Sequence, residues 1–476
     1  MIKDRITEYF AAHREEMLGR LAALCRIPSV DGEPEEGKPY GAEVDRALRL
    51  AEEMFREEGF PTERAPGGEY VLASFGEGER TVGIFAHADI VPAGGGWTVT
   101  EPFEPCEHQG LLVARGVEDN KAGIIAALYL LKAVRELALP VDARLLVFVG
   151  GNEETGMRDV MTFKEEHALP DVSFVPDNSP PLSLGEKGRA EGWLVSPPVL
   201  HTLLDFSGGT AYNVVLDRAA ATLVDTDGAY AALAAVAEGN AALTLTREAG
   251  VLRLAAAGRA AHASAPGGSQ NAAAVLAEAL ASCAVLTPDE RSVMATAARF
   301  LSDPFGGTLG IGGVDGSFGL RTAVCGMARL SDGRLRLSQD IRYGSAVTWR
   351  ALSVLLDGTV RAAGWDFSLG SACDGFDLGD GDPLANALLS DYHRLTGDTA
   401  ATPYRSGGGT YARFLPHAYS MGLCVPTVRP LHGDVLAPGH GAAHAPDEGL
   451  PIDSFLAAMR VLTEYAMAAS DFLTNE

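Results

Sequence analysis

Histidine and carboxylate side chains follow three short apolar runs of this chain, at the point where each run ends. His87 and Asp89 follow the first run, Glu153 and Glu154 follow the second, and Asp177 follows the third. If these runs are parallel strands of one sheet, their carboxyl ends meet at one edge, where ligands usually bind. Several carboxylates at one edge repel one another unless cations offset their charge. Because imidazole and carboxylate together suit zinc, manganese or cobalt, the pattern predicts a metal site.

Two other segments carry groups of the same kind. Asp119 lies in a turn, Arg115-Gly116-Val117-Glu118-Asp119-Asn120-Lys121, that leads into an apolar stretch, and His444 lies in Ala443-His444-Ala445-Pro446-Asp447-Glu448. Each feature alone has an ordinary structural explanation. Asp119 could cap the following helix, Asp177 could do the same in a turn, a lone histidine often only forms hydrogen bonds, and paired glutamates often face solvent. The convergence of all of them favours the metal site.

The elements that must position these residues alternate between helices and buried strands. Helical periodicity predicts helices over residues 2–24, 43–58 and 122–137, and continuous apolar runs predict strands over 82–86, 145–149 and 172–175. Such alternation indicates a parallel sheet covered on both faces. From about residue 185 to 380 the texture changes to short strand-like pieces (242–246, 334–337) and helical stretches (229–237, 271–281). Helices over 383–395 and 452–467 then resume the first pattern. We therefore expect a catalytic domain in two parts, 1–187 and 381–476, around an inserted domain, 188–380.

Composition excludes several classes of protein. The 38 basic and 63 acidic residues leave a formal charge of −25, which disfavours binding to nucleic acid or to anionic membranes. The six cysteines are scattered without a CxxC pair, so we expect reduced thiols and no cysteine-based zinc site. The N-terminal segment lacks the apolar stretch of a signal peptide, and no window reaches the roughly 18 apolar residues of a membrane span. A cytoplasmic protein is the expectation.

The order of the motifs resembles a known family of enzymes. His-x-Asp-x-Val-Pro, Arg-Gly-x-x-Asp-Asn-Lys, Glu-Glu-x-Gly, a strand-end Asp and Ala-His-x-Pro-x-Glu follow one another along the chain. This order resembles the dizinc metallopeptidases that include aminoacylase, carboxypeptidase G, succinyl-diaminopimelate desuccinylase and carnosinase. The chain length and the segment Ser406-Gly407-Gly408-Gly409-Thr410-Tyr411-Ala412-Arg413 are most similar to bacterial dipeptidases of the peptidase V type. The resemblance implies an α/β fold of the zinc-exopeptidase type, with a mixed, mostly parallel sheet flanked by helices and an inserted α+β lid domain.

The resemblance also implies roles for the residues of the predicted site. It implies two divalent ions, zinc or alternatively manganese or cobalt, held by His87 and Asp177 for one ion, Glu154 and His444 for the other, and Asp119 for both. Glu153 would act as the general base on a water that the two ions acidify. Asp89 would accept the second ring proton of His87. Asn120 stands where the family usually has aspartate, and the family holds the peptide bond before it in the cis form.

Four residues outside the metal site match substrate contacts of the family. His262, in Gly258-Arg259-Ala260-Ala261-His262-Ala263-Ser264-Ala265-Pro266, matches the lid histidine that stabilises the tetrahedral oxyanion. Asn213 matches a substrate-contacting asparagine, Arg342 a lid arginine that grips a carboxylate, and Gly408 a backbone N–H donor. Each has an alternative explanation. His262, Asn213 and Gly408 could simply be turn residues, and Arg342 could form a surface ion pair.

The resemblance leaves three functions open. The first is a dipeptidase that hydrolyses small peptides, with a lid long enough for a monomer to be plausible and a homodimer not excluded. The second is a deacylase of N-acyl amino acids or a desuccinylase with the same metals and base. The third is a binding protein that kept the fold, against which the intact Glu153 argues, because binding needs no general base.

Overall fold

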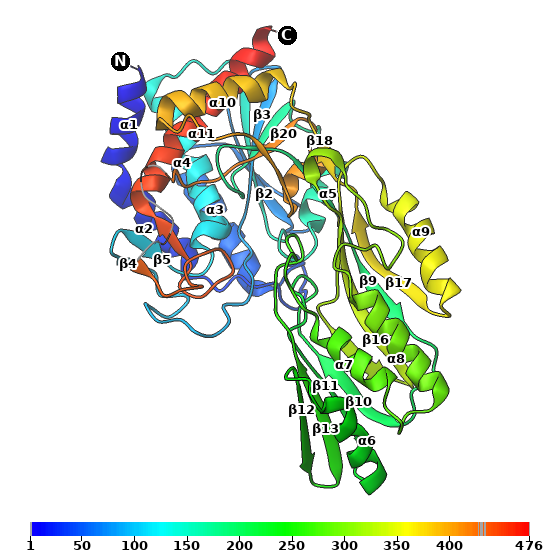
Figure 1. Cartoon of the computed structure of the whole chain (residues 1–476). Helices are drawn as coiled ribbons and strands as arrows, with labels where there is room; N and C mark the ends of the chain where they lie inside the picture. Colours follow the sequence, from blue (N-terminus) through cyan, green and yellow to red (C-terminus); the bar gives the residue numbers. More distant parts are fainter. Residues whose placement is uncertain (1, 427, 429–431, 433–434, 476) are drawn as a thin grey trace. The chain divides into compact units, whose positions relative to one another are not determined.

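The computed structural model describes residues 2–426, 428, 432 and 435–475, which form two compact units (Figure 1). Unit 1 comprises Met1–Gly185, Leu378–Tyr404 and Thr410–Glu476, and unit 2 comprises Glu186–Asp377 and Arg405–Gly409. The five residues 405–409 therefore belong with the inserted segment, although the sequence assigned them to the last part of the chain. That the two units are the catalytic and lid domains stays a prediction.

The sheet of unit 1 combines parallel and antiparallel strands. Its order is β1 (Thr62–Arg64), β2 (Tyr70–Phe75), β6 (Arg144–Gly150), β3 (Thr81–His87), β7 (Val172–Val175), β20 (Ala418–Ser420) and β8 (Ser183–Glu186). The central strands β6, β3, β7 and β20 pair in parallel, as the buried apolar runs predict, while β1, β2 and β8 pair antiparallel at the flanks. The α/β fold class expected from the sequence is confirmed, and the parallel centre brings three strand ends to one edge.

Helices cover both faces of this sheet. Those whose apolar side chains share one core are α1 (Ile2–Ala12), α2 (Arg14–Cys25), α3 (Ala42–Glu57), α4 (Ala122–Leu137), α10 (Pro383–Thr396) and α11 (Ile452–Asn475). Helix α5 (Arg158–Glu166) packs on the other side, where Phe163 contacts the rings of Phe85 and Phe148. The single helix predicted over residues 2–24 is wrong: the structure divides it at His13, whose φ of −96° and ψ of 5° depart from helical geometry.

Smaller elements complete unit 1. A three-stranded sheet consists of β21 (Gly449–Pro451), β5 (Leu111–Val113) and β4 (Cys106–His108). A wide helical turn, η1 (Val117–Lys121), precedes α4, and a short turn, η3 (Tyr411–Phe414), follows the point where the chain re-enters unit 1. The short strands β18 (Phe376–Asp377) and β19 (Tyr404–Ser406) lie where the chain passes between the units. Among the described helices, we find none that combines the length and the apolarity of a bilayer-crossing segment.

Unit 2 is an antiparallel sheet with helices packed against it. The strand order is β12 (Leu243–Glu248), β13 (Val251–Ala257), β11 (Arg218–Val224), β10 (Leu203–Gly208), β15 (Ala328–Ser331), β16 (Arg334–Tyr343), β9 (Gly188–Val195) and β17 (Asp366–Cys373), with β14 (Thr322–Val324) on β16. The helices are α6 (Asp227–Ala237), α7 (Ala272–Ala281), α8 (Pro288–Leu301) and α9 (Trp349–Ala362), and η2 (Gly316–Phe318) is a short turn. Their apolar side chains form a second, separate core.

A buried carboxylate, Glu290, joins the start of α8 to the loop before β10. It forms a capping box with Thr287, whose backbone N–H it accepts at 2.8 Å. It also accepts the backbone N–H groups of His201 (2.9 Å) and Thr202 (2.7 Å) and the Thr202 hydroxyl (2.8 Å). Burial would raise the pKa of this carboxyl, but these donors lower it to about 2. All groups that contact the carboxylate therefore stabilise its charged form.

Replacing Glu290 by glutamine is expected to lower the free energy of unfolding by about 2–4 kcal/mol, because the new amide NH2 would face only donors. The wild type holds its stabilisation above the ordinary carboxyl pKa of 4.5 and loses it as the pH falls toward about 2. Urea denaturation of both proteins should therefore show a difference in the free energy of unfolding that is constant above about pH 5 and narrows as the pH falls from about 4.5 toward about 2. Equal stability at neutral pH would contradict this assignment.

Candidate metal centre

The strand ends of unit 1 bring the predicted site residues together. His87 is the last residue of β3, and Gly150, its register partner on β6, leads into the turn that carries Glu153 and Glu154. Asp177 follows β7, which pairs with the other side of β3. Because β3 lies between these two strands, three chain segments deliver their polar side chains to one edge of the sheet. The parallel pairing inferred from the apolar runs is the physical reason for this convergence.

A first group of possible ligands forms around the His87 ring. Its Nε2 lies 3.0 Å from Asp119 Oδ1 and 3.5 Å from Asp177 Oδ2. One ligand atom from each of these residues lies within 4.8 Å of the others, close enough for one ion to contact all three. The imidazole is fully buried and the carboxylates are partly buried.

A second group forms around His444 and shares one residue with the first. His444 Nε2 lies 3.0 Å from Asp119 Oδ2 and 3.1 Å from Glu154 Oε1. These atoms also fall within 4.8 Å of one another. Asp119 thus contributes one carboxylate oxygen to each group. All five residues predicted as ligands lie in these two groups, and the geometry suits a pair of cations bridged by one carboxylate.

The environment raises the pKa of both imidazoles. Burial opposes the charged form of His87, but hydrogen bonds to Asp119 and Asp177 raise its pKa well above the ordinary value. Hydrogen bonds to Asp119 and Glu154 raise the pKa of His444 to about 11. Both shifts have the same cause, an excess of carboxylates around each ring. The site therefore attracts positive charge strongly.

The pKa values of the carboxyl groups show the same excess of negative charge. Burial and the nearby Asp177 raise the pKa of Glu153 well above its ordinary value, and burial and Asp119 raise that of Glu154 to about 7. Asp119 differs because its pKa is lowered: burial would raise it, but both imidazoles donate to it. With Asp89, whose carboxylate lies 3.3 Å from His87 Nδ1, five carboxyl groups surround the two imidazoles. This donor set fits divalent cations, which would neutralise the remaining negative charge.

Asp89 has two contacts, only one of which the sequence predicted. His87 Nδ1 lies 2.9 Å from the Asp89 backbone oxygen and 3.3 Å from its carboxylate, so the backbone carbonyl is the nearer acceptor of the ring proton. The Asp89 carboxylate accepts the backbone N–H groups of Glu153 (3.2 Å) and Glu154 (3.0 Å). Asp89 therefore holds the glutamate turn as well as the histidine.

The side-chain amide of Asn120 forms hydrogen bonds that an aspartate at this position could not form. Its Nδ2 donates to the Pro176 carbonyl at 2.6 Å and to Asp177 Oδ1 at 3.0 Å. An aspartate at this position would lack that donor and would add one more carboxylate to a crowded site. The peptide bond between Asp119 and Asn120 is cis, as the family resemblance implies.

Two residues near the site carry no sequence motif for their role. Asp159, at the start of α5, accepts the backbone N–H groups of Gly151 (2.8 Å) and Asn152 (2.9 Å), directly before the glutamate pair. The Tyr411 hydroxyl donates to the same carboxylate, and its ring lies edge-on to that of His87. In sequence, an aspartate in the first turn of a helix is ordinary, so nothing marks these two as neighbours of the site.

The four residues predicted to contact substrate all lie in unit 2. A backbone bridge joins Val214 to His262, and Ala263 N–H donates to the Asn213 carbonyl at 2.8 Å, so these two segments are neighbours. The His262 ring accepts the backbone N–H of Ser264 at Nδ1 (3.2 Å). Their substrate roles stay predictions.

Arg342 and the glycine segment also lie together in unit 2. Arg342 donates to Asp340 (2.9 and 3.1 Å) and to the carbonyl of Gly407 (2.5 Å). An ion pair, the alternative explanation for Arg342, is therefore present, but it is buried rather than at the surface. Gly408 N–H donates to Ser406 Oγ at 3.1 Å. A Cβ placed on Gly407 would come within 2.8 Å of the Ser264 Cβ, which explains a glycine at this close approach.

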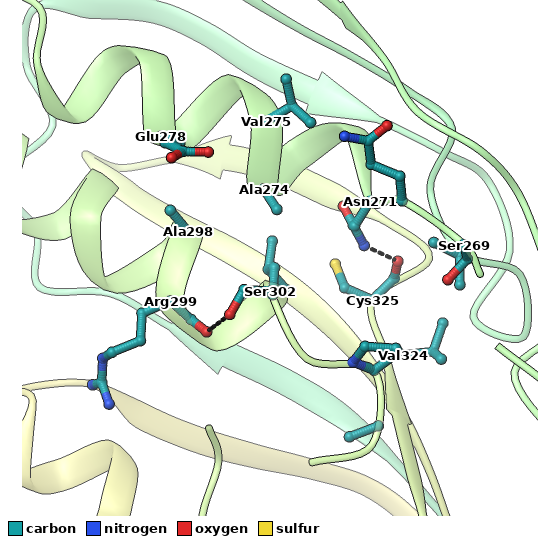
Figure 2. Close-up of a pocket in the computed structure, with 15 residues that line it drawn as sticks. Ser269, Asn271, Ala274, Val275, Glu278, Ala298, Arg299, Ser302, Val324 and Cys325 are labelled. Atoms are coloured by element: carbon teal, nitrogen blue, oxygen red, sulfur yellow. Dashed lines mark hydrogen bonds between the residues drawn. The ribbon is translucent and has the colours of Figure 1, made fainter. Parts of the chain in front are cut away.

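A pocket of about 410 Å³ in unit 2 is separate from these residues (Figure 2). It lies beside α7 and α8, and its lining includes Asn271, Ser302 and Cys325. The Asn271 amide donates to the Cys325 carbonyl at 2.8 Å, and the Ser302 hydroxyl donates to the Arg299 carbonyl at 2.8 Å. The lining contains none of the site residues predicted from the sequence, all of which the structure describes.

The fold and the two ligand groups define a class of protein, the metal-dependent hydrolases built on a mixed α/β sheet. The chain belongs to the peptidase family M20/M25/M40, whose family model matches residues 83–468. It is accordingly a hydrolase of the metallopeptidase class.

Relatives and solved structures agree with this family. Putative dipeptidase YtjP of Bacillus subtilis (strain 168) is 30% identical over 461 residues, which cover 93% of this chain and 95% of that protein. Putative dipeptidase MW1694 of Staphylococcus aureus (strain MW2) is 28% identical over 449 residues, covering 89% and 92%. The crystal structure of human carnosine dipeptidase 1 has a TM-score of 0.60 at 14% identity and covers 99% of both chains. That of the di-peptidase Dug1p from Saccharomyces cerevisiae has a TM-score of 0.59 at 14% identity and covers 98% of both. At these identities the structural likeness shows the fold.

Proposed function

We propose that this chain is a metal-dependent dipeptidase that hydrolyses the peptide bond of small dipeptides. The observation that carries the proposal is the pair of ligand groups that share Asp119, with the carboxylate of Glu153 left outside both. The substrate class comes from the names of the two relatives. The matched region covers 95% of the first relative and 92% of the second. In this proposal His87, Asp119 and Asp177 hold one ion, and Asp119, Glu154 and His444 hold the other.

The chain's own residues then have distinct tasks. The two ions, when bound, would acidify a water and polarise the scissile carbonyl. Glu153 takes the proton of the attacking water and returns it to the leaving amine. Its burial suits this task, because desolvation raises the pKa of the carboxyl and lets it hold a proton between the two transfers.

Other residues in the proposal bind, orient and stabilise. Asp89 fixes the His87 ring and the backbone of the glutamate turn. In unit 2, His262 would donate to the developing oxyanion, and Asn213, Arg342 and Gly408 would contact the substrate. His262 Nδ1 lies 3.2 Å from the backbone N–H of Ser264 and 2.7 Å from Ser264 Oγ. With both groups donating to Nδ1, the proton of the neutral ring would be on Nε2, as a donor to an oxyanion requires.

The metal and the cellular setting complete the proposal. Zinc is the first choice of ion, and manganese or cobalt would accept the same imidazole and carboxylate ligands. All six cysteines are free thiols, which supports a reducing cytoplasmic environment. We propose that the protein is a monomer. Light scattering tests this, because a homodimer would show twice the mass of one chain.

A substrate panel tests the reaction. Purified protein with added zinc or manganese is expected to cleave dipeptides with a free α-amino group. N-acetylated dipeptides should react at least about 100-fold more slowly, because a dipeptidase that pairs the ammonium group of its substrate would reject a substrate that lacks it. Amine release, followed by chromatography, measures both rates.

The same panel separates the alternatives. Tripeptides test the length limit, and N-acyl amino acids test deacylation with the same metals and base. Faster cleavage of N-acyl amino acids than of any dipeptide would replace the dipeptidase with a deacylase. Metal-loaded protein that cleaves none of the panel would instead favour a non-catalytic binding protein.

A further inference from the structure

The carboxylate of Glu448 receives four hydrogen bonds in the interior of unit 1. Its Oε1 accepts the backbone N–H groups of Glu118 (2.9 Å) and Asp119 (3.1 Å). Its Oε2 accepts the backbone N–H of Gly116 (3.0 Å) and the Arg115 guanidinium (2.6 Å). Glu448 and Arg115 are buried, and their side chains are each 1% exposed. One side chain thus holds the whole turn that presents Asp119.

Glu448 is also linked, through Arg115, to the loop that carries His444. Glu448 follows His444 by one short stretch of chain, and Arg115, which pairs with Glu448, also donates to the His444 carbonyl at 3.2 Å. Two residues of this loop have positive φ, His444 at 66° and Asp447 at 52°. Non-glycine residues keep such conformations only where surrounding contacts hold them. Arg115 supplies such a contact at the His444 carbonyl, and Thr98, Val99 and His440 hold the Asp447 carboxylate.

The turn itself is shaped for this contact. Gly116 has φ of 80°, and a Cβ at that position would come within 2.5 Å of the Ile90 side chain. Glycine is therefore required there on both conformational and steric grounds. The turn directs three of its backbone N–H groups, those of Gly116, Glu118 and Asp119, at one carboxylate.

We propose that Glu448 is a positioning residue of the metal centre, which fixes Asp119 through its backbone and couples it to His444 through Arg115. Asp119 is the residue that both ligand groups share, so an error in its position affects both ions at once. Residues that orient metal ligands commonly change metal affinity by about 10–100-fold when they are replaced. The inference rests on the proposed function, because it concerns the ions that the proposal places in these groups.

The test replaces Glu448 by glutamine and measures metal binding. Every partner of the two carboxylate oxygens is a donor, so in either orientation the amide NH2 meets N–H groups and lacks an acceptor. We expect the E448Q protein to bind Zn²⁺ or Mn²⁺ about 10–100-fold more weakly than the wild type after removal of metal with a chelator. Equilibrium dialysis of the metal alone measures this without substrate.

Glu290→Gln is the matched control. The Glu290 carboxylate also has only hydrogen-bond donors around it, from His201, Thr202 and Thr287. Glu290 is 1% exposed, and it lies in unit 2 without contact to a ligand group. Both variants should unfold at lower urea concentration than the wild type, and only E448Q should lose metal affinity. If the two variants lose stability alike and both bind metal like the wild type, Glu448 is a structural residue and the inference is overturned.

A second variant covers the case in which E448Q does not fold. Glu448→Asp keeps the charge and the acceptors but shortens the side chain by one methylene, so it cannot reach all four donors. A folded E448D protein with wild-type metal affinity would also overturn the inference. Failure of the proposed function is distinguishable, since it would appear as wild-type protein that binds metal but cleaves no dipeptide.

Discussion

Replacement of Glu153 by alanine is expected to lower kcat by about 10²–10⁴-fold while the protein still binds its metal ions. Glu153 lies outside both ligand groups, so its removal leaves every proposed ligand in place. What disappears is the carboxylate that accepts the proton of the attacking water. Because substrate contacts are untouched, KM should change little.

Steady-state kinetics and metal analysis on the same preparation check this result. Glu165→Ala is a suitable control, because Glu165 is an exposed glutamate on α5 and should give wild-type rates. A fall in kcat of less than about tenfold would mean that another group acts as the base. Loss of metal from the Glu153 variant would instead make Glu153 a ligand.

Replacement of Asp119 by alanine is expected to abolish binding of both ions and, with it, activity. Asp119 places one oxygen 3.0 Å from His87 and the other 3.0 Å from His444, so no single substitution elsewhere removes a ligand from both groups. Asp177→Ala and Glu154→Ala each remove a ligand from one group only. These two variants should therefore each retain one ion.

Metal stoichiometry measured by elemental analysis after dialysis distinguishes the three variants. The wild type should hold two ions per chain, the Asp177 and Glu154 variants one, and the Asp119 variant none at ion concentrations that saturate the wild type. Chelation of the wild type should abolish hydrolysis, and added zinc or manganese should restore it. An Asp119 variant that retains both ions would exclude a shared ligand.

The arrangement of the metal ligands was predictable because it follows from local sequence. Buried apolar runs that end in His87 and Asp177 indicate parallel strands, and parallel strands bring their carboxyl ends to one edge. Asp119 and His444 lie outside strands, and their place in the site came from the order of motifs. The structure brings them into two groups that share Asp119, and within each group the ligand atoms lie within 4.8 Å of one another.

The second set of contacts was not predictable, because it depends on backbone groups that no residue type reveals. Asp159 and Glu448 act through N–H donors of Gly151, Asn152 and the turn at residues 116–119. Any residue except proline offers such a donor, so the sequence marks Asp159 in no way and shows Glu448 only as the last residue of the Ala-His-x-Pro-x-Glu motif, without its partners. No strand was predicted over residues 70–75, so the antiparallel strand β2 was not located, although the family resemblance implied a mixed sheet.

The inserted segment also limited prediction at its margins. Residues 405–409 pack with unit 2, where the Gly407 carbonyl accepts a hydrogen bond from Arg342, although the strand that contains residues 405 and 406, β19, begins in unit 1. A domain boundary inferred from composition cannot detect that a segment of only five residues, 405–409, belongs to the other unit. The division of the first helix at His13 was not predicted, because the apolar periodicity continues across that residue.

The position of β20 within the sheet has a consequence for synthesis of the protein. Strand β7 ends at Val175, but β20, its parallel partner, begins only at Ala418. A nascent chain therefore leaves the ribosome with one side of β7 unpaired while the whole of unit 2 is being made. Unpaired strand edges recruit other chains. Fragments that terminate before residue 418 should accordingly aggregate, and a chaperone that shields this edge should raise the yield of full-length enzyme.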